Sequence, residues 1–373
     1  MTSNFDRDEE HGKHTNLVNR QVNLIVQKIT VKEEEDDQRL DRWLKKKFPN
    51  LKQPHIEKIC RKGDLRLDGR RVKPSTRIET GQVVRIPPIN ENEYIRPKNL
   101  KQVITDSDAK MLMDSVLYKD EHLIVINKPP GLPVQGGTGQ LKHLDGMSEV
   151  LKFGYPDKPR LVHRLDKDTS GVLLLARSAQ AAKYLTAAFR HRETRKIYWA
   201  AVAGVPTIKT GTIKYGLVKM KGHGPDGMGE KMKCLHPDEV VQIDNAKRAT
   251  TDYTIIDNAG QRVAWLALVP ITGRTHQLRA HVAELGHPIV GDGKYGTNSQ
   301  INEGDGWGSQ LGGEISRKLH LHSKSLSFVH PFTKTIVNFS APLPEHMLRT
   351  WNFLDWTPKE ADLDPFLSDE KKI

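Results

Sequence analysis

One acid in the middle of the chain could do chemistry, and it lies within the stretch LVHRLDKDTSGVLLLA. Asp166 occupies a short polar segment between two apolar runs, and each of these runs predicts a strand. Arg164 and Lys167 flank it, and nearby cations keep an aspartate ionised. An ionised carboxylate held between two strands suits a nucleophile or a base. The same residues also suit a tight turn capped by Thr169 and Ser170, and this stretch alone does not decide between the two interpretations.

Two other segments carry side chains that could act together with this carboxylate. The run ITGRTHQLRAH places Arg274 and Arg279 around a predicted helix start, where a guanidinium could pair with a carboxylate or a phosphate. In RKIYWAAVAG, strand alternation puts Tyr198 on the opposite face from Ile197 and Trp199. An inward tyrosine could stack on a base. An acid, an aromatic ring and arginines therefore suggest chemistry on a nucleic-acid base.

The composition excludes several classes of protein. The chain has 373 residues with 36% hydrophobic content, and its apolar runs are far shorter than the roughly 20 residues of a membrane helix. Its two cysteines cannot build a disulfide framework. The first residues are polar and acidic, unlike a secretory signal. We therefore expect a protein of a reducing, cytoplasmic compartment that does not contact a membrane.

The positive charge is concentrated in one segment. The net charge of the chain is +12, and residues 39–88 contain 15 Lys or Arg against 5 Asp or Glu, which is a net charge of +10. Such a concentration is typical of a protein that binds a polyanion, although a solvated basic face would look the same by charge alone. The predicted RNA contacts in this segment are Arg42, Lys45, Arg61, Lys62, Arg70 and Arg71.

The basic segment also has the pattern of a compact module. Two short helices are predicted from apolar residues at helical spacing, the second of which ends at Gly63. Asp68-Gly69 between alternating residues predicts a hairpin, and 82–87 predicts a strand. The inward residues of the helices are predicted to be Leu40, Trp43, Leu44, Phe48, Ile56, Ile59 and Cys60.

Strands outnumber helices in the rest of the chain and show no regular alternation with them, which predicts an α+β fold with a mostly antiparallel mixed sheet. The helix in THQLRAHVAELG is predicted to turn Leu278, Val282 and Leu285 inward. The domain boundaries that we expect are a disordered polar tail over 1–34, a small α/β module over 35–90, a linker over 91–114, a catalytic domain over 115–355 and a loose end over 356–373.

Two alternative chemistries receive little support from the spacing of residues. His276, His281 and His287 do not have the spacing of a metal-binding motif, so no metal is expected. A retaining glycoside hydrolase also uses a carboxylate at an anomeric carbon, but it needs a second acid about 5 Å away. Asp168 is the only nearby candidate for that acid.

Several motifs together resemble those of a known family. HRLDKDTSG resembles the signature of the RluA-type pseudouridine synthases. KPPGLPVQGG, KIYWAAVAG, TGRTHQLRAHVAELGHPIVGDGKYG and LHLHSKSLSFVHP match the same family in order, over residues 116–343. The basic module resembles the RNA-binding domain found in small-subunit ribosomal protein four. This pairing of domains is similar to that of the bacterial large-subunit ribosomal RNA synthases of the C and D types.

The resemblance implies a pseudouridine synthase fold and an enzyme that isomerises uridine in RNA without a cofactor or metal. It implies that Asp166 is the essential carboxylate, which either attacks the anomeric carbon or takes the ribose 2′-proton. Tyr198 would pack on the flipped uracil, Arg279 would pair with Asp166, and Arg164 would fill the gap left by the base. The resemblance also implies that Arg274 and Lys128 contact a phosphate or the edge of the active site.

The resemblance also implies the partner. The expected substrate is large-subunit ribosomal RNA or its precursor particle, bound by a monomeric enzyme. Transfer RNA is an alternative substrate, and a non-catalytic RNA-binding protein is an alternative class. The second alternative requires that the acid or the tyrosine be missing, and both Asp166 and Tyr198 are present.

Overall fold

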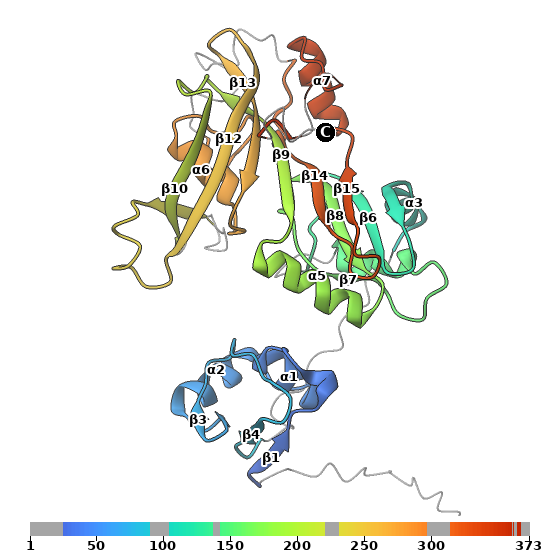
Figure 1. The fold of residues 1–373 in the computed structure, drawn as a ribbon, viewed down its shortest axis with the longest axis vertical. Helices are drawn as coiled ribbons and strands as arrows, with labels where there is room; N and C mark the ends of the chain where they lie inside the picture. The colour runs from blue at the N-terminus through green and yellow to red at the C-terminus, as the bar shows by residue number, and fades with distance from the viewer. Residues whose placement is uncertain are drawn as a thin grey trace, which may run out of the picture. The chain divides into compact units, whose positions relative to one another are not determined.

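The computed structural model describes residues 25–89, 104–136, 142–220, 231–296, 314–359, 361 and 364–366. The chain divides into two compact units, residues 1–101 and residues 102–373 (Figure 1). Over the described ranges, none of the helices is long and apolar enough to cross a bilayer.

The first unit is a four-stranded sheet with two short helices. Its helices are α1 (Leu40–Lys47) and α2 (Gln53–Lys62), after a single 3-10 turn at Glu33–Glu35. The sheet has the antiparallel order β1-β4-β2-β3. Its strands are β1 (Gln27–Thr30), β2 (Arg66–Leu67), β3 (Arg70–Arg71) and β4 (Val83–Ile86). This is the small α/β module that the sequence predicts.

The local sequence explains the elements of this unit. All the predicted inward residues of α1 and α2 are buried in one core, with Leu40, Trp43 and Leu44 fully enclosed. Helix α2 ends because Gly63 adopts the left-handed conformation, with φ of 79°. Asp68 and Gly69 both have positive φ, as a two-residue hairpin turn between β2 and β3 requires.

The first unit starts earlier than the predicted boundary at residue 35. Strand β1 pairs with β4 along its whole length, from Gln27 opposite Ile86 to Thr30 opposite Val83, so these residues belong to the sheet. Their alternating burial is that of an edge strand, a weak pattern in sequence because it spans only four residues. The remainder of the predicted tail, residues 1–24, lies outside the described residues.

The second unit is built on one large sheet. Its main path has the order β11-β10-β12-β13-β9-β14-β8-β6-β5, while β15 pairs with β14 and β7 pairs with β8. All of these pairings are antiparallel except β14 with β8, so the predicted α+β fold with a mostly antiparallel mixed sheet is confirmed. The strands are β5 (Val116–Lys119), β6 (Leu123–Lys128), β7 (Arg160–Leu161), β8 (Ser170–Ala176), β9 (Arg195–Ala203), β10 (Thr210–Lys219), β11 (Met232–Leu235), β12 (Lys247–Ala259), β13 (Val263–Pro270), β14 (Leu321–Val329) and β15 (Ile336–Ser340).

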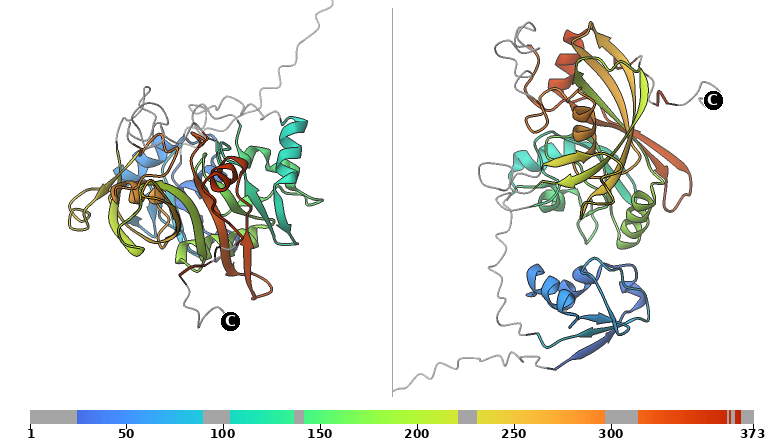
Figure 2. Two further views of the ribbon diagram at one scale, coloured as in Figure 1. Left: turned by 90° about the horizontal axis from the view of Figure 1, so that it is seen from above. Right: turned by 90° about the vertical axis from the view of Figure 1, so that its left-hand side faces the viewer.

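Helices cover both faces of this twisted sheet (Figure 2). Helix α6 packs against β10, β11, β12 and β13, and α5 packs against β7 and β8. The central strands β8 and β13 are buried along their whole length, which explains their continuous apolar sequences. In α6, Leu278 and Val282 are buried as predicted, but Leu285, the residue just after the helix end at Glu284, is 36% exposed, so its predicted burial is wrong. The helices are α3 (Asp106–Asp114), α4 (Leu144–Met147), α5 (Ala179–His191), α6 (Gln277–Glu284) and α7 (Glu345–Phe353), with a 3-10 turn at Ser148–Leu151.

The second unit also extends beyond its predicted limits of 115 and 355. Helix α3 lies within the predicted linker, yet its Leu112 is fully buried in the core of this unit. Near the other end, Asp364 accepts two hydrogen bonds from Arg195 of β9, at 2.8 and 2.9 Å, and Phe366 packs on the core. Residue 90, residues 91–103 of the predicted linker, and residues 360, 362–363 and 367–373 of the predicted loose end lie outside the described residues.

A close approach between strands positions the candidate site. Gly171 at the start of β8 pairs in parallel with Ser323 of β14, and Ser323 is in turn opposite Tyr198 of β9. A Cβ on Gly171 would lie 2.2 Å from the carbonyl oxygen of Ser323, so only glycine allows the strands to meet here. These pairings of Gly171 with Ser323 and of Ser323 with Tyr198 bring the polar turn that contains Asp166, just before β8, to the same part of the sheet as Tyr198.

Candidate active site

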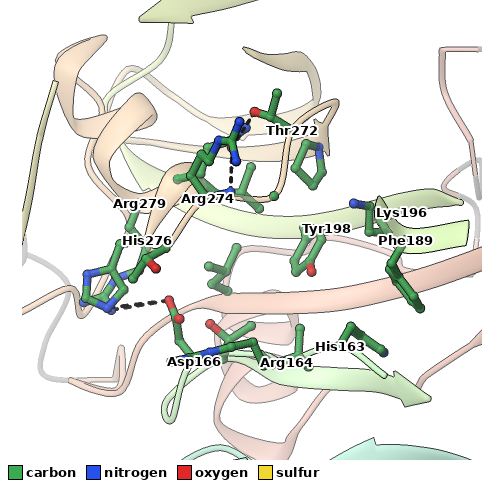
Figure 3. A pocket seen from close by; sticks show the side chains of 18 residues that line it. His163, Arg164, Asp166, Phe189, Lys196, Tyr198, Thr272, Arg274, His276 and Arg279 are labelled. Carbon is green, nitrogen blue, oxygen red and sulfur yellow. Dashed lines mark hydrogen bonds and ion pairs between the residues drawn. The ribbon is translucent and has the colours of Figure 1, made fainter. Parts of the chain in front are cut away.

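The predicted carboxylate and most of the predicted substrate contacts line one cavity. Its volume is about 320 Å³, which is within the usual range for a small-molecule pocket. Figure 3 shows Asp166 on one wall, the side chains from β9 and α5 on another, and the turn that leads into α6 opposite. Of the residues predicted from the sequence, the following line the cavity: Arg164, Asp166, Tyr198, Arg274 and Arg279.

Lys128 does not line this cavity, so its predicted role as a phosphate or edge contact is wrong. Its side chain is completely buried at the end of β6, and its Nζ donates to the carbonyl oxygens of Pro129, Leu132 and Lys167 at 2.8, 2.9 and 3.0 Å. Burial lowers the pKa of Lys128 to about 7, although the carboxylates of Asp168 and Asp166 oppose this shift. Through its hydrogen bond to the carbonyl of Lys167, Lys128 thus connects the turn after Asp166 to the end of β6.

The predicted tyrosine lines the same cavity. Tyr198 is half-buried, borders the cavity, and has its hydroxyl hydrogen-bonded to the side chain of Ser323 (Figure 3). Its neighbours Ile197 and Trp199 point into the core on the other face of β9, in accordance with the strand alternation. The surrounding protein desolvates the phenol and raises the pKa of Tyr198 to about 12. The ring therefore presents a neutral aromatic surface to the cavity.

The principal partner of Arg279 is Asp292 and not Asp166. Its Nε and Nη2 donate to the two carboxylate oxygens of Asp292, both at 2.7 Å, and the Asp292 side chain is fully buried. The remaining nitrogen, Nη1, is 3.9 Å from Oδ2 of Asp166. The expected pair with Asp166 is therefore a long ion pair, held in place by a second carboxylate that the sequence analysis did not single out.

A network of hydrogen bonds holds the turn that leads into α6. The side-chain oxygen of Gln277 accepts from the hydroxyl of Thr272 at 2.6 Å and from the backbone N–H of Arg274 at 3.1 Å. Its amide nitrogen donates to the carbonyl of Thr250 and the hydroxyl of Thr251 on β12. Because Gln277 is buried, this network fixes the direction in which the following residues enter the cavity.

Cations gather at the mouth of the cavity. Arg164 is exposed, Arg274 and Lys196 are half-buried, and all three line it. The ring of His163 stacks on Phe189 at 4.3 Å, and its Nε2 accepts the backbone N–H of Leu174. Desolvation and the nearby Lys196 lower the pKa of His163 to about 3, so this ring stays neutral. An anionic ligand is favoured by this arrangement.

His276 is a cavity residue to which the sequence analysis gave no role. Its Nε2 is 3.8 Å from Oδ2 of Asp166, and its Nδ1 is 3.1 Å from the hydroxyl of Tyr295. It follows the first arginine of the run GRTHQLR, but no periodicity rule predicts where a residue in a turn will point. Asp292 was missed for a similar reason: it lies 13 residues after Arg279, beyond a helix end and a turn.

Asp166 is the only carboxylate among the described residues that line the cavity. Asp168, the one candidate for a second catalytic acid, is exposed and lies outside the lining. A retaining glycosidase needs two carboxylates facing one site, so the cavity does not fit that chemistry. Thr169 also lines the cavity, and its buried hydroxyl has no hydrogen-bond partner among the described residues.

Comparison with known proteins assigns both units. Residues 122–284 match the family described as RNA pseudouridylate synthase, and residues 38–84 match the S4 domain. The chain is 32% identical to ribosomal large subunit pseudouridine synthase C of Vibrio cholerae, over 88% of this chain and 96% of that protein. It is also 32% identical to the mitochondrial RNA pseudouridine synthase 4 of Arabidopsis thaliana, over 84% and 78% of the two chains.

A solved structure agrees with these sequence relatives. The human protein called RNA pseudouridylate synthase domain containing 4 superposes with a TM-score of 0.53 at 32% identity, covering 66% of this chain and 95% of that one. Fold, cavity and relatives together define an isomerase that acts on RNA. The chain belongs to the RluA-type family and is an RNA pseudouridine synthase with an N-terminal S4 domain.

Proposed function

We propose that this enzyme converts uridines of large-subunit ribosomal RNA to pseudouridine, with Asp166 as the essential carboxylate. The observation that carries the proposal is that, among the residues described, Asp166 is the single carboxylate of a cavity that is also lined by Tyr198 and by the cations Arg164, Lys196, Arg274 and Arg279. Its side chain is 21% exposed and lines the cavity, while Lys128 holds the turn next to it through the carbonyl oxygen of Lys167.

The reaction needs one base–ribose bond to break and a carbon–carbon bond to form. Asp166 would attack the anomeric carbon, or would accept the ribose 2′-proton, and either step releases the uracil from C1′. The freed base turns within the cavity and rejoins through C5, which then loses its proton. Tyr198 offers the aromatic surface on which a uracil can stack while it turns.

The cations suit the entry of RNA. A uridine must leave its stack to reach the carboxylate, at a cost of a few kcal/mol of unstacking, which is smaller in loops than in helices. Arg164 is exposed beside Asp166, so we assign it to the gap left by the flipped base. Arg274 and Lys196 would contact the flanking phosphates.

The basic face of the S4 unit would capture the same RNA. Of its predicted contacts, five are exposed and Lys45 is half-buried. The side chain of Arg71 on β3 folds over Gly63 at the end of α2, next to Arg61 and Lys62. A cluster of cations at the end of α2 is suited to a phosphate backbone.

The proposed substrate rests on the bacterial relatives, which are named ribosomal large subunit pseudouridine synthases. The test incubates the full chain separately with transcripts of large-subunit ribosomal RNA, small-subunit ribosomal RNA and transfer RNAs, and then maps pseudouridines by base-specific chemical labelling and reverse transcription. We expect defined sites in the large-subunit RNA alone. Conversion confined to transfer RNA would favour the alternative substrate, and conversion of no RNA would contradict the proposal.

A further inference from the structure

His276 has an unusual backbone for the residue that begins a helix. It is the N-cap of α6, with φ of 51° and ψ of 20°, which is the left-handed region. An N-cap residue is normally extended and uses a Ser, Thr, Asp or Asn side chain to accept a hydrogen bond from the first turn. His276 makes no such bond. The helix start therefore carries conformational strain and lacks a side-chain cap, and strain of this kind concentrates at functional sites.

The strained backbone directs the imidazole of His276 toward Asp166 (Figure 3). The ring is 92% buried, and its Nε2 lies 3.8 Å from Oδ2 of the carboxylate. Nη1 of Arg279 approaches the same oxygen from 3.9 Å. Both contacts involve Oδ2, so the carboxylate is held through one oxygen and can present Oδ1 to the substrate.

Tyr295 contacts the other side of the His276 ring. The hydroxyl of Tyr295 accepts the backbone N–H of Met232 at 2.8 Å and is 3.1 Å from Nδ1 of His276. With Met232 as its donor, the hydroxyl can direct its own hydrogen to Nδ1. A neutral imidazole that accepts at Nδ1 carries its hydrogen on Nε2, and the tautomer is set by the bond that the other nitrogen makes.

Other charged groups pack around Tyr295 without replacing this contact. The guanidinium of Arg279 lies over its ring at 5.3 Å, and Nζ of Lys231 lies over the ring at 5.5 Å. Desolvation raises the pKa of Tyr295 to about 12, so its hydroxyl keeps the hydrogen that it would donate.

We propose that His276 and Tyr295 form a positioning relay, in which the Tyr295 hydroxyl fixes the tautomer of His276 so that its Nε2–H holds Oδ2 of Asp166. The inference deepens the proposed function and rests on Asp166 being its catalytic carboxylate. The separation of 3.8 Å is longer than a hydrogen bond, and such contacts tighten when a substrate closes the site. His276 is a positioning residue in this scheme, because it acts on the reaction through Asp166.

The test separates positioning from structural support. His276→Asn removes the imidazole, but asparagine tolerates the left-handed backbone and can cap the helix. We expect an unchanged or higher melting temperature and unchanged RNA affinity, with a single-turnover rate reduced roughly 10- to 100-fold, the range for a hydrogen bond to a charged group. Tyr295→Phe keeps the ring and should lower the rate in the same direction by a smaller factor.

The double variant decides whether the two residues act in one relay. If they do, His276→Asn with Tyr295→Phe should be no slower than His276→Asn alone, because the first change has already broken the interaction that the second one removes. Multiplied rate losses, or a Tyr295→Phe rate equal to that of the wild type, would overturn the proposal. The proposal would also be overturned if His276→Asn had both a slower rate and a lower melting temperature than the wild type, because the rate loss would then reflect lost structural support. Wild-type protein assayed in parallel separates the two ideas: an inactive wild type would refute the proposed function instead.

Discussion

Arg279 donates both of its short hydrogen bonds, at 2.7 Å, to the fully buried Asp292, and reaches Asp166 only at 3.9 Å. Because the buried Asp292 carboxylate binds Nε and Nη2 of Arg279, it orients the guanidinium so that Nη1 faces Asp166. This arrangement makes Asp292 part of the support for Asp166, the proposed catalytic carboxylate, although Asp292 does not line the cavity.

Removal of Arg279 should therefore affect stability as well as rate. Arg279→Ala leaves a buried, unpaired carboxylate at Asp292, which costs about 3 to 5 kcal/mol of unfolding free energy. The double variant Arg279→Ala with Asp292→Asn should recover part of that loss without recovering activity. Urea unfolding and single-turnover rates measure both quantities. Equal stability of wild type and Arg279→Ala would show that the pair does not support the fold.

Gly171 provides a second test of how the site is positioned. An alanine here would place its Cβ 2.2 Å from the Ser323 carbonyl oxygen, at a φ of 108° that suits glycine. We expect Gly171→Ala to cost about 2 to 5 kcal/mol, from the backbone strain and the overpacking together. Gly260→Ala is the matched control, because Gly260 also has positive φ but no atom near the added Cβ. It should lose only about 1 to 2 kcal/mol and retain full activity. Similar losses of stability and activity for both would contradict the proposed strand contact.

Buried neutral histidines predict a loss of stability in acid. Burial lowers the pKa of His322 to about 3, and its ring bonds Ser170 and the carbonyl of Ala341. The unfolded chain takes up a proton near pH 6.5, so between about pH 6.5 and 3 it binds more protons than the folded chain. Stability is therefore complete above about pH 6.5 and falls as the pH is lowered, by up to about 1.4 kcal/mol per pH unit for this group. Denaturant unfolding from pH 7 to pH 4 should show a smaller decline for His322→Asn than for the wild type, and parallel curves would exclude this assignment.

The S4 unit should contribute most of the salt dependence of RNA binding. Replacing Arg61, Lys62, Arg70 and Arg71 by serine in the full chain should reduce the slope of log affinity against log salt by about 0.7 to 0.9 for each phosphate that the variant no longer binds. Lys110→Ser, an exposed lysine of the second unit, is the control and should leave the slope unchanged. An unchanged slope in the fourfold variant would remove these residues from the RNA-binding surface.

Local patterns predicted the elements of this protein well, and the contacts between distant elements poorly. The two helices and the hairpin of the first unit follow from apolar spacing, Gly63 and Asp68-Gly69, all within a few residues. Lys128 was misplaced because lysine usually indicates an exposed charge, and only the fold shows the three carbonyls around it.

The limits of the two units were misjudged for the same reason. Strand β1 and Asp364 join their units through partners far away in the sequence, and no local signal marks such pairs. Strand alternation and an isolated polar turn made Tyr198 and Asp166 candidates in the sequence, and the family resemblance supplied their expected roles. Their approach to one cavity depends on the parallel pairing of β8 with β14.

The most direct test of the account is the replacement of Asp166 by asparagine, which keeps the shape of the side chain and removes its charge. Asp168→Asn is the control, since Asp168 is an exposed acid outside the cavity in the same turn. Pseudouridine formation releases the hydrogen at C5, so tritium release from RNA labelled at C5 of uridine reports the reaction. We expect no release by Asp166→Asn, with RNA affinity and melting temperature unchanged, and near wild-type release by Asp168→Asn. Tritium release by Asp166→Asn at the wild-type rate would contradict the assignment of Asp166 as the essential carboxylate.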